Sequence, residues 1–302
     1  PLASLMVRAS YGTGFMAPSL TDVHAADSYG FPSFTDKTAC ERDKTAGVDD
    51  PGTCKSTQYL VKKSGNKNLK EEKSKSMNIG FMIQPSPLFG IGLDMWRVDM
   101  TNVVGIDYDD LMEAEHDGID VSKHGIIITR DSKGNISEIE APLQNLASRE
   151  TAGIDLSLNA STPKMKFGTF GLRIEHAMLQ FFREQGFPGV GKVDKLDERS
   201  LPKWKNNITL GYGIANSEVE MTARTIPGQK KTVEKEGRLS AHTEVDAVYS
   251  YDTSWKGTVT VGGTNVLGKD PPLDSSDPQA MLDGSLYDQV GRTFYVGYKQ
   301  TF

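Results

Sequence analysis

The sequence predicts an all-β chain in which about ten antiparallel strands form part of an up-and-down transmembrane β-barrel. Three observations predict this fold. Apolar and polar residues alternate in long segments, the connections between these segments alternate between short and long, and aromatic residues gather near the predicted strand ends. No run of about 20 apolar residues, the length that a transmembrane helix needs, occurs in the 302 residues. A transmembrane strand needs only about 10 residues, of which every second one is apolar.

Alternation with a period of two identifies the strands. In the clearest case Phe294, Val296 and Tyr298 share one face. These segments exceed the usual strand length of about 5–6 residues. In the segment 88–101 the apolar residues change parity at Met95, where we expect a β-bulge. The predicted strands are residues 4–13, 72–84, 88–101, 148–161, 168–181, 203–214, 218–226, 238–251, 255–266 and 291–302.

The connections distinguish a barrel from a soluble β-sandwich, whose strands alternate in the same way. Outer-membrane barrels have short periplasmic turns and long extracellular loops, whereas a sandwich has no reason to keep such an order. Tight turns are predicted at 85–87, 162–166, 216–217 and 252–254, and long polar connections at 14–71, 102–147, 182–202, 227–237 and 267–290. Short and long connections alternate along the whole chain, so we expect the long ones at the extracellular end.

Aromatic residues and charge agree with this assignment. Interfacial belts of membrane proteins favour amphipathic rings, and several lie near predicted strand ends. The net charge of −6 is spread along the sequence without a basic block, which argues against a nucleic-acid surface. The residues expected in the belts are Trp204, Tyr212, Tyr249, Tyr251, Trp255 and Phe302.

The first long connection holds the only two cysteines. Cys40 and Cys54 lie 14 residues apart in a polar segment, an arrangement that suits a disulfide in an oxidising compartment; two free thiols are the alternative. The same connection carries four aromatic residues, which we expect either to contact a ligand or to pack the loop against its neighbours. They are Tyr29, Phe31, Phe34 and Tyr59.

The second long connection begins with an acidic stretch, residues 107–120. It lacks the spacing of a calcium loop, and we expect a short surface helix with acids near its N-terminus. Asp107 and Tyr108 are candidate ligand contacts there. Residues 126–140 read as a hairpin that turns at 133–135, and residues 186–192 read as a flexible loop.

The sequence offers no catalytic constellation and no set of residues with metal-ligand spacing, so we predict neither an enzyme nor a resident cofactor or metal. Charged residues on the alternate faces of the strands are expected to line the lumen of the barrel. They are Glu218, Glu220, Arg224, Glu244 and Asp246.

Five phrases resemble the C-terminal part of TonB-dependent outer-membrane receptors, in the order that the family has them. They are RASYGTGFMAPSL, GNKNLKEEKSKSMNIGF, RETAGIDLSL, GGTNVLGKDPP and the terminal RTFYVGYKQTF. Two positions depart from the family pattern: Met16 stands where arginine is usual, and Glu71 stands where proline is usual. The paired cysteines resemble one proteobacterial branch of the family.

The resemblance implies a 22-stranded barrel filled by a plug, of which residues 1–302 are the C-terminal portion; the plug and the earlier strands would precede them. It implies an active transporter in the outer membrane of a Gram-negative bacterium, which is energised by the TonB–ExbB–ExbD complex and takes up a siderophore, another metal complex, an oligosaccharide or a peptide. A passive porin or an adhesin is the alternative. Phe302 resembles the signal that the barrel-assembly machinery reads, and lipid and lipopolysaccharide would surround the barrel.

Overall fold

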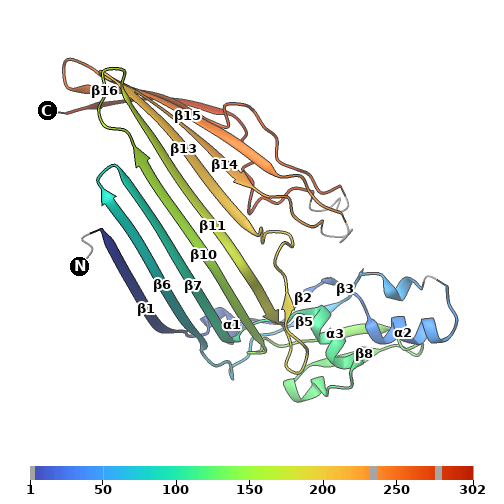
Figure 1. The fold of residues 1–302 in the computed structure, drawn as a ribbon. Helices are drawn as coiled ribbons and strands as arrows, with labels where there is room; N and C mark the ends of the chain where they lie inside the picture. The colour runs from blue at the N-terminus through green and yellow to red at the C-terminus, as the bar shows by residue number, and fades with distance from the viewer. Residues whose placement is uncertain (1–3, 50, 232–236, 276–280, 302) are drawn as a thin grey trace.

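The computed structural model describes residues 4–49, 51–231, 237–275 and 281–301. Its main element is one sheet in which ten antiparallel strands follow each other in chain order (Figure 1). A short eleventh strand, β12 (Val193–Asp194), pairs with β11. The ten strands are β1 (Leu5–Met16), β6 (Glu72–Ser86), β7 (Phe89–Val103), β10 (Ala147–Ser161), β11 (Thr169–Gln185), β13 (Trp204–Ile214), β14 (Ser217–Ile226), β15 (His242–Asp252), β16 (Gly257–Thr264) and β17 (Thr293–Gln300).

All ten predicted strands are present, and their ends differ by a few residues. β11 continues past the expected end at 181 to Gln185. β15 begins at His242 rather than at 238, because Leu239 donates its backbone N–H to the carbonyl of Gln229 within the preceding loop. Buried loop contacts therefore replace strand pairing there.

The sheet is open among the described residues. β1 pairs only with β6, and β17 pairs only with β16, so the first and last strands do not close a small barrel. Each edge strand keeps a row of unpaired backbone groups. Such groups would cost several kcal/mol each if the edges faced hydrocarbon without a partner strand.

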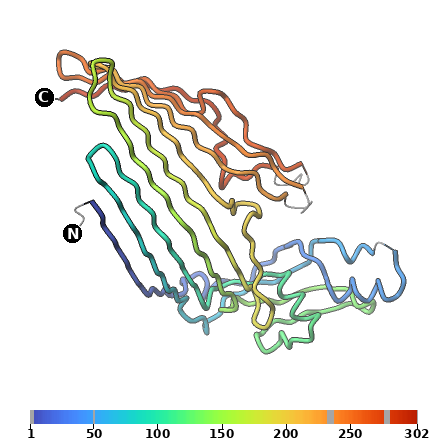
Figure 2. Tube along the Cα trace, viewed as in Figure 1, coloured from blue at the N-terminus to red at the C-terminus, as the bar shows by residue number. Residues whose placement is uncertain are grey.

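The two ends of the sheet differ as predicted. Short turns join β6 to β7, β10 to β11, β13 to β14, and β15 to β16, while every other connection in the path is long. Figure 2 follows the chain through both kinds of connection. The turn after β6 lies at the end of the sheet opposite to helix α2 (Lys37–Thr45), which carries Cys40 (Figure 1). We name these the turn end and the loop end.

The β-bulge expected at Met95 is wrong. Met95 pairs in continuous register with Ile79 of β6 and Ile154 of β10. The extra residue in β7 lies between Met100 and Val103. The apolar residues change parity because Trp96, in the regular register, lies on the polar face of the sheet. The Trp96 ring packs against Gly153, where an added Cβ would lie 2.5 Å from the ring. A second irregularity lies in β11 beside Ala152 and Gly153 of β10.

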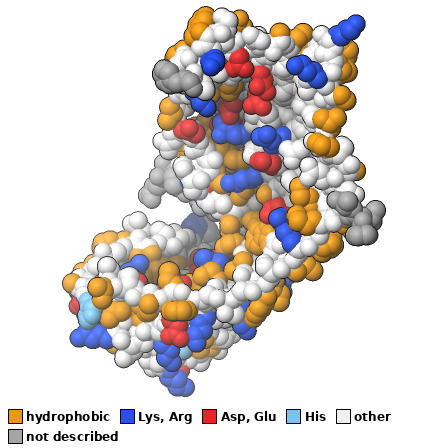
Figure 3. Space-filling model, turned by 90° about the vertical axis from the view of Figure 1, so that its left-hand side faces the viewer, with side chains coloured by type: hydrophobic (Ala, Val, Ile, Leu, Met, Phe, Trp, Pro, Cys, Tyr) orange, Lys and Arg blue, Asp and Glu red, His pale blue; other side chains and the backbone are white. Residues whose placement is uncertain are grey.

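The two faces of the sheet separate by chemistry. Strand register places Leu210, Met221 and Ala247 on one face, and that face leaves many large apolar side chains exposed, among them Val7 at 59% and Met77 at 53%. The opposite face is polar. Figure 3 shows charged side chains along the middle of the visible face of the sheet and hydrophobic ones along its margins. A soluble sandwich would bury its apolar face, so the sandwich reading fails.

The main hydrophobic core lies instead in the long connections at the loop end. Residues 17–49, 51–71 and 104–146 fold together into what we call the loop domain, whose core includes Val61, Leu111 and Ile139. It contains a four-stranded sheet with the order β2-β5-β9-β8, separate from the main sheet. Its elements are α1 (Leu20–His24), β2 (Ser28–Gly30), β3 (Ser33–Phe34), α2, η1 (Gly52–Cys54), β4 (Thr57–Gln58), β5 (Val61–Lys63), α3 (Tyr108–His116), η2 (Val121–His124), β8 (Ile127–Arg130) and β9 (Ile136–Glu140).

Three expectations for these connections have clear outcomes. The hairpin at 126–140 is confirmed as β8 and β9, which turn through Gly134 at a φ of 81°. The acidic stretch forms helix α3 with Asp107 as its N-cap, although Leu111, Met112 and Ala114 are buried rather than on the surface. Among the described residues, no helix combines the length and the apolar character needed to cross a bilayer.

The expectation of a flexible loop at 186–192 is wrong. Phe187 is 0% exposed and Val190 is 5% exposed, because both join the core of the loop domain. The edge of Phe187 packs against His124 at 5.2 Å between ring centroids. The connection between β11 and β13, residues 186–203, which we call the third loop, therefore anchors the loop domain to β11.

Candidate functional site

The five charged residues expected to line a lumen share the polar face of β14 and β15. Glu218 pairs across the strands with Ser250, and Arg224 pairs with Glu244. The guanidinium of Arg224 lies 2.9 Å from a carboxylate oxygen of Glu244 and 2.9 Å from one of Asp246. Cross-strand pairs of opposite charge stabilise a sheet, and here they also give it a hydrophilic surface. The remaining residue of the group is Glu220 on β14.

A buried cluster continues this polar face toward the loop end. His242 is 3% exposed and its Nε2 lies 2.9 Å from Glu244 Oε1. Because a carboxylate only accepts hydrogen bonds, Nε2–H donates and Nδ1 is left without a partner among the described residues. The ring of Tyr287, from the loop before β17, packs edge-on against His242 at 5.3 Å. Together with Arg224 and Asp288, these side chains line a cavity of about 240 Å³.

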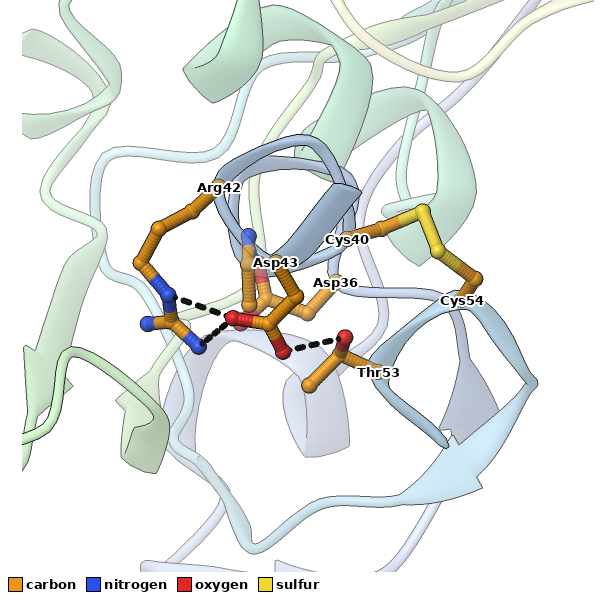
Figure 4. Close-up of a disulfide and its surroundings, with 7 residues drawn as sticks. Asp36, Cys40, Arg42, Asp43, Thr53 and Cys54 are labelled. Atoms are coloured by element: carbon orange, nitrogen blue, oxygen red, sulfur yellow. Dashed lines mark hydrogen bonds and ion pairs between the residues drawn. A yellow bond between two sulfur atoms is a disulfide. The ribbon is translucent and has the colours of Figure 1, made fainter. Parts of the chain in front are cut away.

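The expected disulfide is present. Cys40 on α2 bonds to Cys54 on η1, with a Cα–Cα distance of 4.6 Å (Figure 4). A second link runs beside it, since Thr53 donates its hydroxyl to Asp43 at 2.8 Å. Helix α2 begins where the Asp36 side chain accepts from the N–H of Ala39 at 3.1 Å. Two cross-links to η1 and the cap at Asp36 thus hold this helix in the loop domain.

Arg130 is the charged centre of the loop domain, and the sequence did not point to it. Its guanidinium contacts Asp36 at 2.7 Å and Glu115 at 2.7 Å, and Asp36 is only 1% exposed. Burial would lower the pKa of Arg130, but the two carboxylates outweigh burial and raise it. The pairing residues lie 94 and 15 positions away, so no local pattern could have identified the network.

The aromatic residues of the first loop divide into two groups. Phe34 is 1% exposed and stacks on Tyr59 at 4.6 Å and on Tyr108 at 5.4 Å between ring centroids. This stack supports the loop core, and burial raises the pKa of Tyr108 to about 12. Tyr29 and Phe31 are each 62% exposed, so their rings are open to a ligand.

Asp107 connects the loop domain to the third loop. Its carboxylate lies 2.8 Å from the ammonium of Lys195, which also lies 3.3 Å from Glu184 of β11. Burial opposes ionisation of Asp107, but Lys195 and the N–H groups of α3 outweigh it and lower the pKa of Asp107. The residue is half-buried and already paired, which makes it a structural link before any ligand arrives.

The remaining long loops are joined by two buried carboxylates that the sequence did not single out. Asp197 is 2% exposed and accepts from Arg238 at 2.6 and 3.0 Å. Asp283 is 7% exposed and accepts from the hydroxyl of Ser200 at 2.8 Å. Loops that are far apart in the chain therefore meet above β11 to β17. No group of three or more potential metal ligands occurs within the described ranges.

Comparisons with known proteins agree with this geometry. The family model described as TonB dependent receptor-like, beta-barrel, matches residues 1–266. No curated protein sequence matches the chain. Among solved structures, the siderophore receptor PirA from Acinetobacter baumannii matches with a TM-score of 0.63 and 14% identity, over 99% of this chain and 39% of that one.

Two further structures show the same fold. A mutant of the ferric enterobactin receptor PfeA from Pseudomonas aeruginosa matches with a TM-score of 0.59 and 14% identity, over 98% of this chain and 38% of that one. The ferric-catecholate import receptor Fiu from E. coli K12 matches with a TM-score of 0.52 and 14% identity, over 98% of this chain and 32% of that one. The chain thus spans less than half the length of these receptors. The match to the family model, with the open sheet and its two distinct ends, establishes that this chain belongs to the TonB-dependent receptor family and has the fold of its β-barrel.

Proposed function

We propose that residues 1–302 are the C-terminal portion of the barrel of an outer-membrane active transporter, which takes up a scarce solute with energy delivered through TonB. In this proposal the open edges of β1 and β17 pair with earlier strands, and a plug fills the lumen. The TonB–ExbB–ExbD complex would act on the plug, and the barrel-assembly machinery would read Phe302. That residue lies outside the described part of the chain.

The single observation that carries the proposal is the exposed apolar face of the sheet, which a lipid layer would cover. Trp204 and Tyr212 lie at the two ends of β13 on this face, eight residues apart. At about 3.3 Å per residue they are about 26 Å apart along the strand, or about 20 Å after a tilt of about 40°. An outer-membrane barrel has an apolar band of about 25 Å between its aromatic girdles. The ring spacing on β13 is about 5 Å shorter than this band, but the longest strand, β11 with 17 residues, rises about 40 Å at the same tilt, which is enough to cross it.

The polar face and the loop domain support a route for a hydrophilic solute. Charged pairs such as Arg224 with Glu244 would face the hydrated lumen and the plug. We propose that Tyr29 and Phe31 contact the solute at the mouth, because they are the exposed members of the first-loop aromatic group. The similar solved structures are siderophore receptors, so metal–siderophore complexes are the first solutes to test, followed by other metal complexes, oligosaccharides and peptides.

The experiment is uptake by cells that produce the full-length protein. Labelled solutes are offered to matched strains with and without TonB, and a cell that lacks the protein provides the background. We expect saturable uptake that disappears when TonB is absent. Uptake that is unchanged without TonB would instead support a passive porin, and surface binding without uptake would support an adhesin.

A further inference from the structure

We infer that a groove on the apolar face, at the turn end of the sheet, binds a glycerophospholipid with an anionic headgroup. This inference rests on the proposed membrane placement and adds a defined lipid site to it. The groove lies on the outside of the sheet, away from the charged face proposed for the solute route.

The groove is formed by strands β10, β11, β13 and β14. It is an open depression of about 470 Å³, and its walls are almost entirely apolar. Strand register explains the composition, because Leu172 pairs with Leu210 and Leu210 pairs with Met221, all on the same face. The rings of Phe170 and Tyr212 pack at 4.9 Å between centroids and form the wall nearest the turn. Val219 completes the lining on the β14 side.

The groove does not depend on segments beyond this chain. Each of its four strands is paired on both sides within the ten-strand path. The missing strands would add to β1 and β17, and a plug would occupy the other face of the sheet. Neither can cover the groove, so its occupant must come from the surrounding layer or be another protein.

The turn next to the groove carries positive charge. Residues 162–168 join β10 to β11 and contain Lys164 and Lys166 but no carboxylate. Both lysines are exposed, and Thr162 at the start of the same turn lines the groove. The turn is held in place because Tyr212 donates its hydroxyl to the carbonyl of Phe167 at 2.8 Å. Two exposed lysines thus lie on the turn whose first residue lines the groove.

This combination selects one occupant. Acyl chains fill the apolar part without leaving polar groups unpaired, and a phosphate-bearing anionic headgroup at the turn end meets the two lysines. Each lysine near an anionic lipid surface contributes about 1 kcal/mol, which corresponds to about fivefold in affinity, or about 25-fold for the pair. A zwitterionic phospholipid would lack most of this gain.

The test uses the full-length receptor purified in detergent, with phosphatidylglycerol and phosphatidylcholine as probes. Native mass spectrometry gives the affinity for each lipid, and the temperature of barrel unfolding gives the stabilisation. We expect preferential binding of phosphatidylglycerol, which falls about 25-fold in the variant Lys164→Gln/Lys166→Gln. The matched control Lys67→Gln/Lys70→Gln removes the same charge at the loop end and should leave the affinity unchanged. A Leu210→Trp variant, which fills the groove, should weaken both lipids.

Equal affinity for the two lipids, or no effect of Lys164→Gln/Lys166→Gln, would overturn the inference. A receptor dimer that excludes lipid and is separated by Leu210→Trp would also overturn it, by assigning the groove to a second copy. Because the turn is remote from the proposed solute contacts, uptake should be normal in the lysine variants. Normal uptake without lipid preference would reject the lipid site alone, whereas a protein that is extracted without detergent would reject the membrane placement itself.

Discussion

Replacing Arg130 by methionine should destabilise the loop domain while the barrel stays intact. The guanidinium makes hydrogen bonds of 2.7 and 3.0 Å to Asp36 and of 2.7 Å to Glu115. Methionine has a similar length but leaves the Asp36 carboxylate, 1% exposed, with the N–H of Ala39 as its remaining partner among the described residues. Removing one member of a buried ion pair costs about 3–5 kcal/mol, so we expect the loop domain to lose about that much stability.

Hydrogen exchange of the helix α2 amides in the full-length protein measures this loss. A cost of about 3 kcal/mol corresponds to about 150-fold faster exchange, at about 1.4 kcal/mol per factor of ten. The double variant Arg130→Met/Asp36→Asn should recover part of the protection, since it removes the unpaired charge and asparagine still caps a helix. Exchange that changes less than about threefold in Arg130→Met, or a double variant no better than the single one, would refute the reasoning.

Three further predictions concern the disulfide, a turn and the loop contacts. Replacing Cys40 and Cys54 by serine opens a loop of about 15 residues and should cost the loop domain about 3 kcal/mol, measured by the same exchange experiment with reduced wild type as the comparison. Gly168→Ala should destabilise a turn by about 1–3 kcal/mol, because φ is 110° and the added Cβ would lie 2.5 Å from a backbone oxygen. The temperature of the heat-induced gel-mobility shift of the barrel should therefore fall. Gly171→Ala, with open space at its Cβ, is the control that should leave this temperature unchanged. Burial alone would raise the pKa of Asp197, but its cationic partners outweigh burial and lower this pKa in the folded protein. The ion pairs of Asp197 therefore stabilise the fold fully above its unfolded-state pKa of about 3.9, and this stabilisation is lost as the pH falls through the lower folded-state pKa. Proteolysis of the loop at 186–203 should therefore accelerate below about pH 4 in the wild type and show a smaller pH dependence in Asp197→Asn; equal pH profiles would contradict this.

The ten-strand sheet was largely determined by the sequence itself. A strand that faces lipid on one side must alternate at every position, and a hairpin meander must reverse direction at each connection. Both constraints are local, so the pattern around Val219 and Met221 shows them directly. The disulfide between Cys40 and Cys54 could also be predicted, because only two cysteines are present.

Only the tertiary structure decided how the long connections fold and what they do. The expected bulge at Met95 and the expected flexible loop around Phe187 were wrong, because each depended on a partner far along the chain: Gly153 under Trp96 in one case and the loop-domain core in the other. Phe34 was grouped with the exposed Tyr29 for the same reason. Local alternation reports which side of a strand meets lipid, whereas the burial of a loop residue depends on segments that only folding brings together.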